Sequence, residues 1–181
     1  FRSIHRAIRK LAPGEALRIR GGQLESWRYW QPHYRPKEDF DEPQALAQLE
    51  IELRKSVESM MVADVPLGSF LSGGIDSSLV SALMTDIGGR PINTFHLGFV
   101  GRDAESEHEK AAIVARHIGA HHHVLMMEGK AIVDAFDDFG RVFDEPYGDP
   151  AAVPTLLLAQ MARQQVTVAL SAPVVNILER G

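Results

Sequence analysis

Apolar and polar positions alternate near the N-terminus of the chain. Residues 16–20 (Ala-Leu-Arg-Ile-Arg) and 23–27 (Gln-Leu-Glu-Ser-Trp) follow a period of two on either side of Gly21 and Gly22. A period of two sends successive side chains to opposite faces of a strand, and adjacent glycines readily form a tight hairpin turn. The pattern therefore predicts a β-hairpin.

Prolines and charged residues separate this hairpin from the rest of the chain. The prolines stand at positions 32, 36 and 43. A polar, proline-rich segment is typical of a linker, so a domain boundary is expected within residues 31–43. We divide the chain into a small β unit over residues 1–36 and a second domain over residues 37–181.

Beyond the linker, helical and strand patterns alternate. Apolar residues at helical spacing predict helices over residues 44–62, 77–86, 105–118, 132–143 and 154–164. Short apolar runs predict strands over residues 65–71, 92–99, 122–126 and 166–170. Strands that alternate with helices are typical of a parallel sheet with helices on both faces, so the expected fold class is α/β.

Composition narrows the function classes. The chain has 181 residues and is 45% hydrophobic, enough for a core of ordinary size. It has no apolar run of membrane-spanning length and no signal-peptide core at its start, so we expect a cytoplasmic protein without a membrane partner. Zero cysteines exclude disulfides, thiolate zinc sites and a cysteine nucleophile within this stretch. A net charge of −5 does not favour binding to a nucleic acid.

Residues 70–78, Phe-Leu-Ser-Gly-Gly-Ile-Asp-Ser-Ser, lie where the first strand of the sheet leads into a helix. The two glycines let the backbone approach an anion closely, and we expect the amides of Ser72, Gly74 and Ser77 to point into one concavity. Asp76 would repel a bare phosphate but would suit a phosphate that carries Mg²⁺. The alternative is a glycine-rich turn with Asp76 or Ser77 as a helix cap. Neither a Walker A loop nor a dinucleotide fingerprint fits this spacing.

Residues 72–78 resemble the pyrophosphate loop of the ATP-pyrophosphatase group, whose members cleave ATP to AMP and pyrophosphate. Further blocks look like the synthetase domain of glutamine-dependent asparagine synthetases and lie at residues 63–68, 95–99, 119–123, 144–147 and 168–171. Residues 1–31 look like the end of that family's glutaminase domain. The resemblance covers about residues 1–171, and the loop is its most specific part.

This resemblance implies a two-part amidotransferase whose second part has an adenine nucleotide alpha hydrolase-like fold. Glutamine would be hydrolysed in one domain, and ammonia would meet a β-aspartyl-AMP made from ATP and aspartate in the other. The implied pyrophosphate and Mg²⁺ residues are Ser72, Gly73, Gly74, Asp76, Ser77 and Ser78, with Asp76 as the metal ligand and catalytic residue. The implied adenosine residues are Leu71, Leu97 and Ser171. A homodimer is compatible with the resemblance.

Three other polar segments are weaker candidates. The histidines at residues 121–123 alternate between the faces of a predicted strand, so we do not expect them to converge on one metal ion. Asp144, Glu145 and Asp149 lie in a loop expected at the carboxyl edge of the sheet. They either help to bind Mg²⁺ or the substrate amine, or form a solvated acidic turn. Residues 105–110 are expected to be the solvated face of a helix.

The sequence departs from the family pattern near its C-terminus. The family has a Ser-Gly-Asp/Glu-Gly-x-Asp-Glu block after the last strand, whereas this chain reads Ser171-Ala172-Pro173. Together with the start on Phe1 and the missing glutaminase cysteine, this suggests a piece of a longer protein or a truncated product. We expect the chain as given to make little or no asparagine from ammonia. Asparagine synthesis, adenylation of another acid as in a β-lactam synthetase, and nucleotide binding without catalysis all stay open.

Overall fold

The computed structural model describes residues 3–35, 37, 39–100, 104–143 and 148–172. The chain divides into two compact units, Phe1–Ala45 and Leu46–Gly181, which we call the first and second unit. This division lies beyond the expected boundary between residues 36 and 37, and the assignment of the first part to a glutaminase remnant stays a prediction. No helix within the described residues is long and apolar enough to cross a membrane.

The first unit contains the predicted hairpin. Strands β1 (Glu15–Arg20) and β2 (Gln23–Arg28) pair in antiparallel register. Gly21 and Gly22 join them with φ angles of 58° and 78°. Both angles lie in the left-handed region, which glycine enters without a steric penalty. The period-two pattern and the glycine pair therefore predicted this element correctly.

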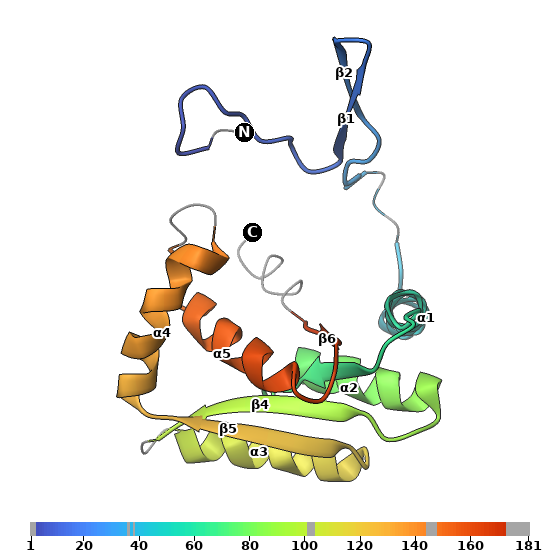
Figure 1. Ribbon diagram of the computed structural model, residues 1–181. Helices are drawn as coiled ribbons and strands as arrows, with labels where there is room; N and C mark the ends of the chain where they lie inside the picture. The colour runs from blue at the N-terminus through green and yellow to red at the C-terminus, as the bar shows by residue number, and fades with distance from the viewer. Residues whose placement is uncertain (1–2, 36, 38, 101–103, 144–147, 173–181) are drawn as a thin grey trace. The chain divides into compact units, whose positions relative to one another are not determined.

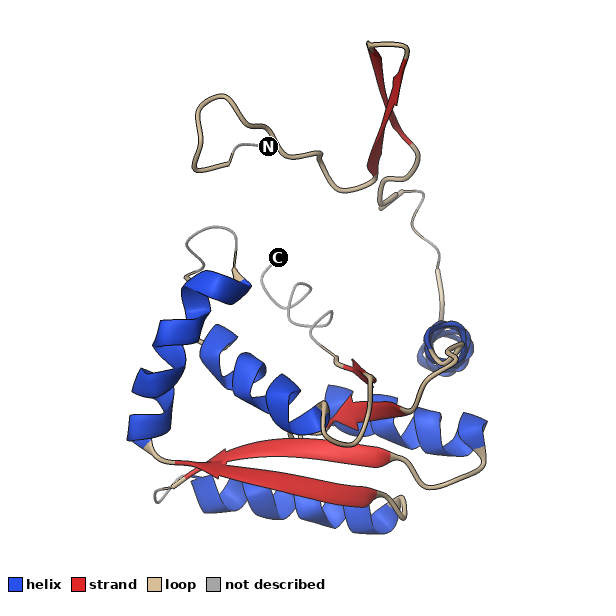
Figure 2. Ribbon diagram, viewed as in Figure 1, coloured by secondary structure: helices blue, strands red, loops and turns tan. Residues whose placement is uncertain are grey.

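The second unit is built on a parallel sheet (Figure 1 and Figure 2). Its elements, with the helix that leads into it, are α1 (Glu42–Met60), β3 (Leu67–Phe70), α2 (Ile75–Gly88), β4 (Asn93–Phe99), α3 (Ala104–His117), β5 (His121–Met127), α4 (Gly129–Val142), α5 (Ala152–Ala162) and β6 (Val168–Leu170). The strand order is β5-β4-β3-β6, and every pairing is parallel. The α/β prediction with a parallel sheet is confirmed.

Successive residues of β3 and β4 face opposite layers of the second unit. Phe70 and Phe95 are neighbours in register and pack toward α5. Leu71 turns to the other face, where it packs against Ala111 of α3. On that same face α1 and α2 pack together around Met84. Figure 1 shows α3 and α5 on opposite sides of the sheet, so helices cover both faces as expected.

The bounds of most elements differ by a few residues from the expected ones, and the ends of β3 and α2 lie nearest the loop. The first strand of the sheet was expected to end at Leu71, but β3 ends at Phe70. The amide of Leu71 still donates to the Phe95 carbonyl oxygen at 2.9 Å, so the ladder continues by one bond. Helix α2 runs through Gly88, because it is Gly89, with a φ of 59°, that takes the left-handed conformation and caps the helix.

Candidate functional site

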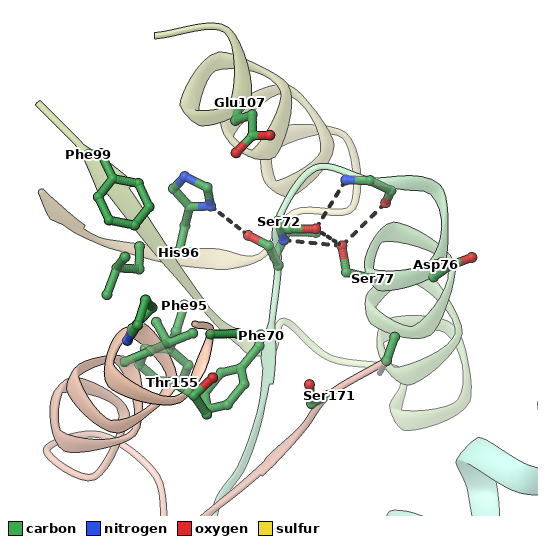
Figure 3. A pocket seen from close by; sticks show the side chains of 17 residues that line it. Phe70, Ser72, Asp76, Ser77, Phe95, His96, Phe99, Glu107, Thr155 and Ser171 are labelled. Carbon is green, nitrogen blue, oxygen red and sulfur yellow. Dashed lines mark hydrogen bonds between the residues drawn. The ribbon is translucent and has the colours of Figure 1, made fainter. Parts of the chain in front are cut away.

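A cavity of about 530 Å³ opens at the carboxyl ends of β3, β4 and β6 (Figure 3). Strand β3 lies between β4, the next strand in sequence, and β6, the last strand of the sheet. From β3 the chain adds β4 and β5 on one side of the sheet and β6 on the other, so the strand order reverses between β3 and β6. Ligands of open α/β sheets bind in crevices at such points, and the volume is that of an ordinary small-molecule site.

Most of the site residues expected from the sequence meet at this cavity. Those that line it are Leu71, Ser72, Gly74, Asp76, Ser77, Leu97 and Ser171. Gly73 and Ser78 are not among the lining residues. The Ser78 hydroxyl donates to the Gly74 carbonyl oxygen at 2.7 Å, so it stabilises the first turn of α2. The ligand-binding roles of all these residues stay predictions.

Two serines close the loop that follows β3. The Ser72 amide donates to Ser77 Oγ at 3.1 Å, and the two hydroxyl oxygens are 2.9 Å apart. The Gly74 amide donates to Ser72 Oγ at 3.3 Å. We expected the amides of Ser72 and Gly74 to point into the cavity, but the hydroxyl groups are nearer acceptors and hold them inside the loop. The first-turn amides of α2 have no acceptor within the helix, and amides of this kind are the donors that a helix N-terminus offers to an anion.

Gly73 fits the loop against α3. Its φ is 82°, and a Cβ atom at this position would lie 2.7 Å from the Ala111 amide nitrogen and 2.9 Å from Lys110 Cβ. A side chain is therefore excluded both by the backbone conformation and by the packing. The glycine brings the loop and the backbone of α3 into direct contact beside the cavity.

Buried hydroxyl groups tie α2 to the strand that precedes it. Ser69 Oγ lies 2.9 Å from Ser81 Oγ, and the Ser81 hydroxyl donates to the Ser77 carbonyl oxygen at 2.8 Å. Ser69 and Ser81 are fully buried. Buried polar groups stabilise a fold when their hydrogen bonds are satisfied, as they are here. The pair fixes the first turns of α2 against β3 and so places Ser77 at the cavity.

The side of the cavity formed by β4 and α5 is largely apolar. Its lining includes Phe95, Leu97 and Phe99 of β4, together with Leu158 and Thr155 of α5. We had expected only Leu97 of these. Alternate positions of a strand face the same way, so the pattern Phe-x-Leu-x-Phe could have identified the two phenylalanines. Thr155 could have been noticed as a hydroxyl group in the first turns of a mostly apolar helix.

Three imidazoles gather on the face of the sheet that α3 covers, namely His96, His108 and His122. The ring centroid of His96 is 5.8 Å from that of His108 and 6.2 Å from that of His122. His96 Nε2, His108 Nδ1 and His122 Nε2 are buried without a hydrogen-bond partner. Among the described residues no group of three such side chains has an arrangement that could hold a metal ion.

Burial keeps two of these rings neutral. It lowers the pKa of His96, against a weaker opposing effect of its hydrogen bond to the Leu71 carbonyl. Burial, with the neighbouring rings as smaller causes, lowers the pKa of His122 to about 4. His122 Nδ1 lies 2.9 Å from Thr94 Oγ1 on this face, whereas His123 stacks on Phe95 on the other. The alternation expected for residues 121–123 thus separates neighbouring rings, and the cluster arises from three different elements.

The acidic residues of the site are few within the described chain. Asp76 lines the cavity from α2, and its carboxylate points away from Ser72 and Ser77 (Figure 3). Glu107 also lines the cavity, although its helix face was expected to be merely solvated. Carboxylates are the donor type that Mg²⁺ takes, one or two at a time, together with phosphate oxygens. Asp149 Oδ1 accepts a bond from the Ala151 amide at 2.8 Å, as in an acidic turn.

The other two acidic candidates, Asp144 and Glu145, lie outside the described residues, as does Pro173. The described chain ends at Ala172, which lines the cavity next to Ser171. The functional contribution of the acidic loop as a whole therefore stays a prediction.

Comparison with known proteins finds several relatives that bear the name of an asparagine synthetase. A protein of Mycobacterium tuberculosis that bears the name of a glutamine-hydrolysing asparagine synthetase is 37% identical, over 93% of this chain and 26% of its own length. Asparagine synthetase (glutamine-hydrolysing) 1 of Bacillus subtilis is 31% identical, over 91% of this chain and 26% of its own. Among solved structures, the ammonia-dependent NAD synthetase of Campylobacter jejuni is 15% identical, with a TM-score of 0.48, over 70% of this chain and 56% of its own.

These relatives are ligases, and the chain spans about a quarter of the length of the curated ones. The model of the asparagine synthase family matches residues 48–172, which is most of the second unit. This matched stretch includes the loop, the strands that line the cavity and Ser171. The chain therefore belongs to the asparagine synthase family.

Proposed function

We propose that the second unit binds ATP and takes part in an amide-forming reaction in which aspartate is adenylated and then converted to asparagine. The observation that carries this proposal is the loop of residues 72–78, which opens α2 at the carboxyl end of β3 and lines a cavity of about 530 Å³. Membership of the asparagine synthase family supports the same reaction.

The two sides of the cavity suit the two ends of a nucleotide. Hydroxyl groups, the first-turn amides of α2 and the positive end of the helix dipole favour a polyphosphate near Ser72 and Ser77. Leu97, Phe99 and Leu158 offer apolar walls for a planar base. We therefore place the pyrophosphate part at the loop and the adenosine between Leu71, Leu97 and Ser171.

The proposed chemistry has two steps. A carboxylate oxygen of aspartate attacks the α-phosphorus, and the bond to the bridging oxygen breaks as pyrophosphate leaves. Ammonia then attacks the acyl carbon of the β-aspartyl-AMP, gives up a proton and displaces AMP, which leaves asparagine. Charge accumulates on the departing pyrophosphate in the first step, so donors preorganised in the loop would stabilise its transition state.

Asp76 is the described residue that we propose as the Mg²⁺ ligand. Asp76 would hold the ion, which would supply positive charge toward the leaving pyrophosphate. The loop serines would then orient the polyphosphate. This assignment depends on the donor type and on the position of Asp76 at the cavity.

We further propose that the ammonia comes from glutamine, hydrolysed in a glutaminase domain of which residues 1–36 are the end, and that the reaction takes place in the cytoplasm. The names of the curated relatives as glutamine-hydrolysing enzymes support this source. Ammonium salts should bypass the glutaminase step, so the chemistry of the second unit can be tested by itself.

The test is calorimetry of the full chain with Mg-ATP, Mg-AMP and inorganic pyrophosphate, followed by assay of AMP, pyrophosphate and asparagine with aspartate and ammonium. We expect Mg-ATP and pyrophosphate to compete for one site, and slow pyrophosphate release that depends on aspartate. Release that depends on another acid would favour a relative of the β-lactam synthetases. Binding without release would indicate a nucleotide-binding piece, and absence of nucleotide binding would contradict the proposal.

A further inference from the structure

The peptide between Leu71 and Ser72 is where β3 passes into the loop. The Leu71 amide donates to the Phe95 carbonyl oxygen at 2.9 Å, which is the last ladder bond of the strand. The Leu71 carbonyl oxygen lies 2.9 Å from His96 Nδ1. Leu71 is 1% exposed and His96 is 3% exposed, so water does not compete for this carbonyl. The end of the strand is thus held by an imidazole from the neighbouring strand.

This hydrogen bond and one from the loop hold the same rigid group. A peptide unit is planar, so the Leu71 carbonyl and the Ser72 amide cannot turn independently. His96 binds the carbonyl end of this plane, and Ser77 Oγ accepts from its amide end at 3.1 Å. Loss of either bond would free the plane to rotate. The direction of the Ser72 amide therefore depends on a side chain outside the loop.

The ring must act as a donor toward Leu71. A carbonyl oxygen only accepts, so Nδ1 carries a proton, and in the neutral ring Nε2 then carries a lone pair. Nε2 is buried without a partner, as a neutral ring in this tautomer allows. The charged groups and rings that face it are His108 and Glu107 of α3 and His122 of β5. Burial lowers the pKa of His96 and so disfavours a second proton, with His108 as a smaller cause in the same direction and the Leu71 hydrogen bond and Glu107 acting against it.

We propose that His96 is a positioning residue for the pyrophosphate loop, and that its neutral Nδ1–H orients the 71–72 peptide so that Ser72 and Ser77 can receive an anion. The inference rests on the proposed function only for the identity of the anion. The orientation of the peptide is a property of the chain alone and can be tested without a ligand.

The test compares His96→Asn with His96→Leu in the full chain. The asparagine Nδ2–H₂ lies at the position of the imidazole Nδ1 and keeps a donor toward Leu71, whereas leucine fills similar space without one. His122→Leu is the matched control, because His122 is on the same face but bonds to Thr94 instead of the loop. The readouts are hydrogen exchange of the Ser72 amide without ligand, and calorimetry with inorganic pyrophosphate.

A hydrogen bond of ordinary net strength corresponds to a factor of about ten. We expect His96→Leu to speed exchange at Ser72 and to weaken pyrophosphate binding about tenfold, whereas His96→Asn stays within about threefold of the parent. The midpoint temperature of thermal unfolding should fall for His122→Leu, while the hydrogen-exchange rate of the Ser72 amide should not change. Equal effects of His96→Leu and His96→Asn, or the same change at Ser72 from His122→Leu, would overturn the proposal.

Two further results keep the proposal decidable. If the parent chain does not bind pyrophosphate, the proposed function fails, while exchange at Ser72 still decides the role of His96. If His96→Leu does not fold, the ¹⁵N signals of the His96 ring in the parent protein decide it. The Nδ1–H tautomer supports the proposal, and the Nε2–H tautomer contradicts it.

Discussion

Two glycine pairs occupy turns of very different kinds. Gly21 and Gly22 turn the hairpin of the first unit, and a Cβ atom on either would meet nothing within 4 Å. Gly73 and Gly74 turn β3 into α2 in the second unit, and a Cβ atom on Gly73 would lie 2.7 Å from a backbone nitrogen of α3. Both pairs use positive φ angles, at Gly21, Gly22 and Gly73. In the first turn glycine serves the chain conformation alone, whereas in the second it also serves close packing.

The difference extends to the surroundings of each turn. Ile19 and Leu24 lie opposite each other in the hairpin, and both are about two-thirds exposed. The loop at Gly73, in contrast, is fixed by the buried Leu71 peptide on one side and by Ser77 on the other. A local pattern can specify the first turn, while the second depends on residues far away in sequence. Substitutions should therefore have local effects in one and functional effects in the other.

The largest effect should follow Gly73→Ala. The positive φ costs about 1–2 kcal/mol with a Cβ atom, and the approach to the α3 backbone adds to it, so we expect a loss of about 3 kcal/mol or more in the free energy of unfolding. Pyrophosphate affinity should fall at least about a hundredfold, because the loop must move. Urea denaturation and calorimetry measure the two quantities.

Gly74→Ala is the matched control for that substitution. Gly74 has a φ of −75°, and its Cβ atom would make only an ordinary contact, 3.4 Å from Ser72 Oγ. We expect its stability to stay within about 1 kcal/mol of the parent. If both alanine variants lose the same stability and the same affinity, the packing of Gly73 against α3 is not what sets the loop.

Asp76→Asn should have the next largest effect and act on charge alone. The carboxylate is proposed to hold Mg²⁺, so Mg-ATP affinity should fall about tenfold or more, while binding of metal-free ATP should hold or improve. Calorimetry with and without Mg²⁺ distinguishes these cases. Equal weakening of both would mean that Asp76 contributes to the site without binding metal.

The sequence predicted the local elements and the gathering of the expected residues at one cavity better than it predicted how the loop is held. The hairpin, the parallel sheet and the approach of Leu71, Leu97 and Ser171 to one cavity follow from periodicity and family resemblance. The contact of His96 with Leu71 does not, because it joins residues 25 positions apart through side-chain direction across two strands. Such contacts depend on the register between strands. The hydrophobic pattern alone predicts which face of the sheet a side chain occupies, but not which residue of the next strand lies beside it.

The inward turn of the loop amides was missed for a related reason. A donor is expected to face a ligand only when no closer acceptor exists, and the hydroxyl groups of Ser72 and Ser77 are such acceptors. The prediction failed because the same groups can satisfy the backbone when no ligand competes.

A lower pH should reduce the stability of the second unit more than that of the hairpin. The pKa of His122 is lowered from 6.5 to about 4, so the unfolded chain binds this proton before the folded one does. The free energy of unfolding should therefore be unaffected by this group above pH 6.5 and fall as the pH decreases from 6.5 to about 4. Urea denaturation across this range checks the slope.

His122→Leu removes the titrating group while keeping a side chain of similar size at the same place. Its slope between pH 6.5 and about 4 should be smaller than that of the parent protein. An unchanged slope would assign the acid sensitivity to other groups and not to the imidazole cluster beneath α3.

The smallest effect on the second unit is expected from Gly22→Ala. A Cβ atom at this turn meets no neighbour, so only the left-handed φ of 78° is penalised, by about 1–2 kcal/mol. Hydrogen exchange in β1 and β2 should therefore accelerate, while pyrophosphate affinity and the unfolding of the second unit stay as in the parent. Gly22→Asn should recover much of the loss, because asparagine tolerates this conformation better than alanine. A change in pyrophosphate affinity upon Gly22→Ala would show that the hairpin turn is coupled to the nucleotide site, and would end the distinction between the two glycine pairs.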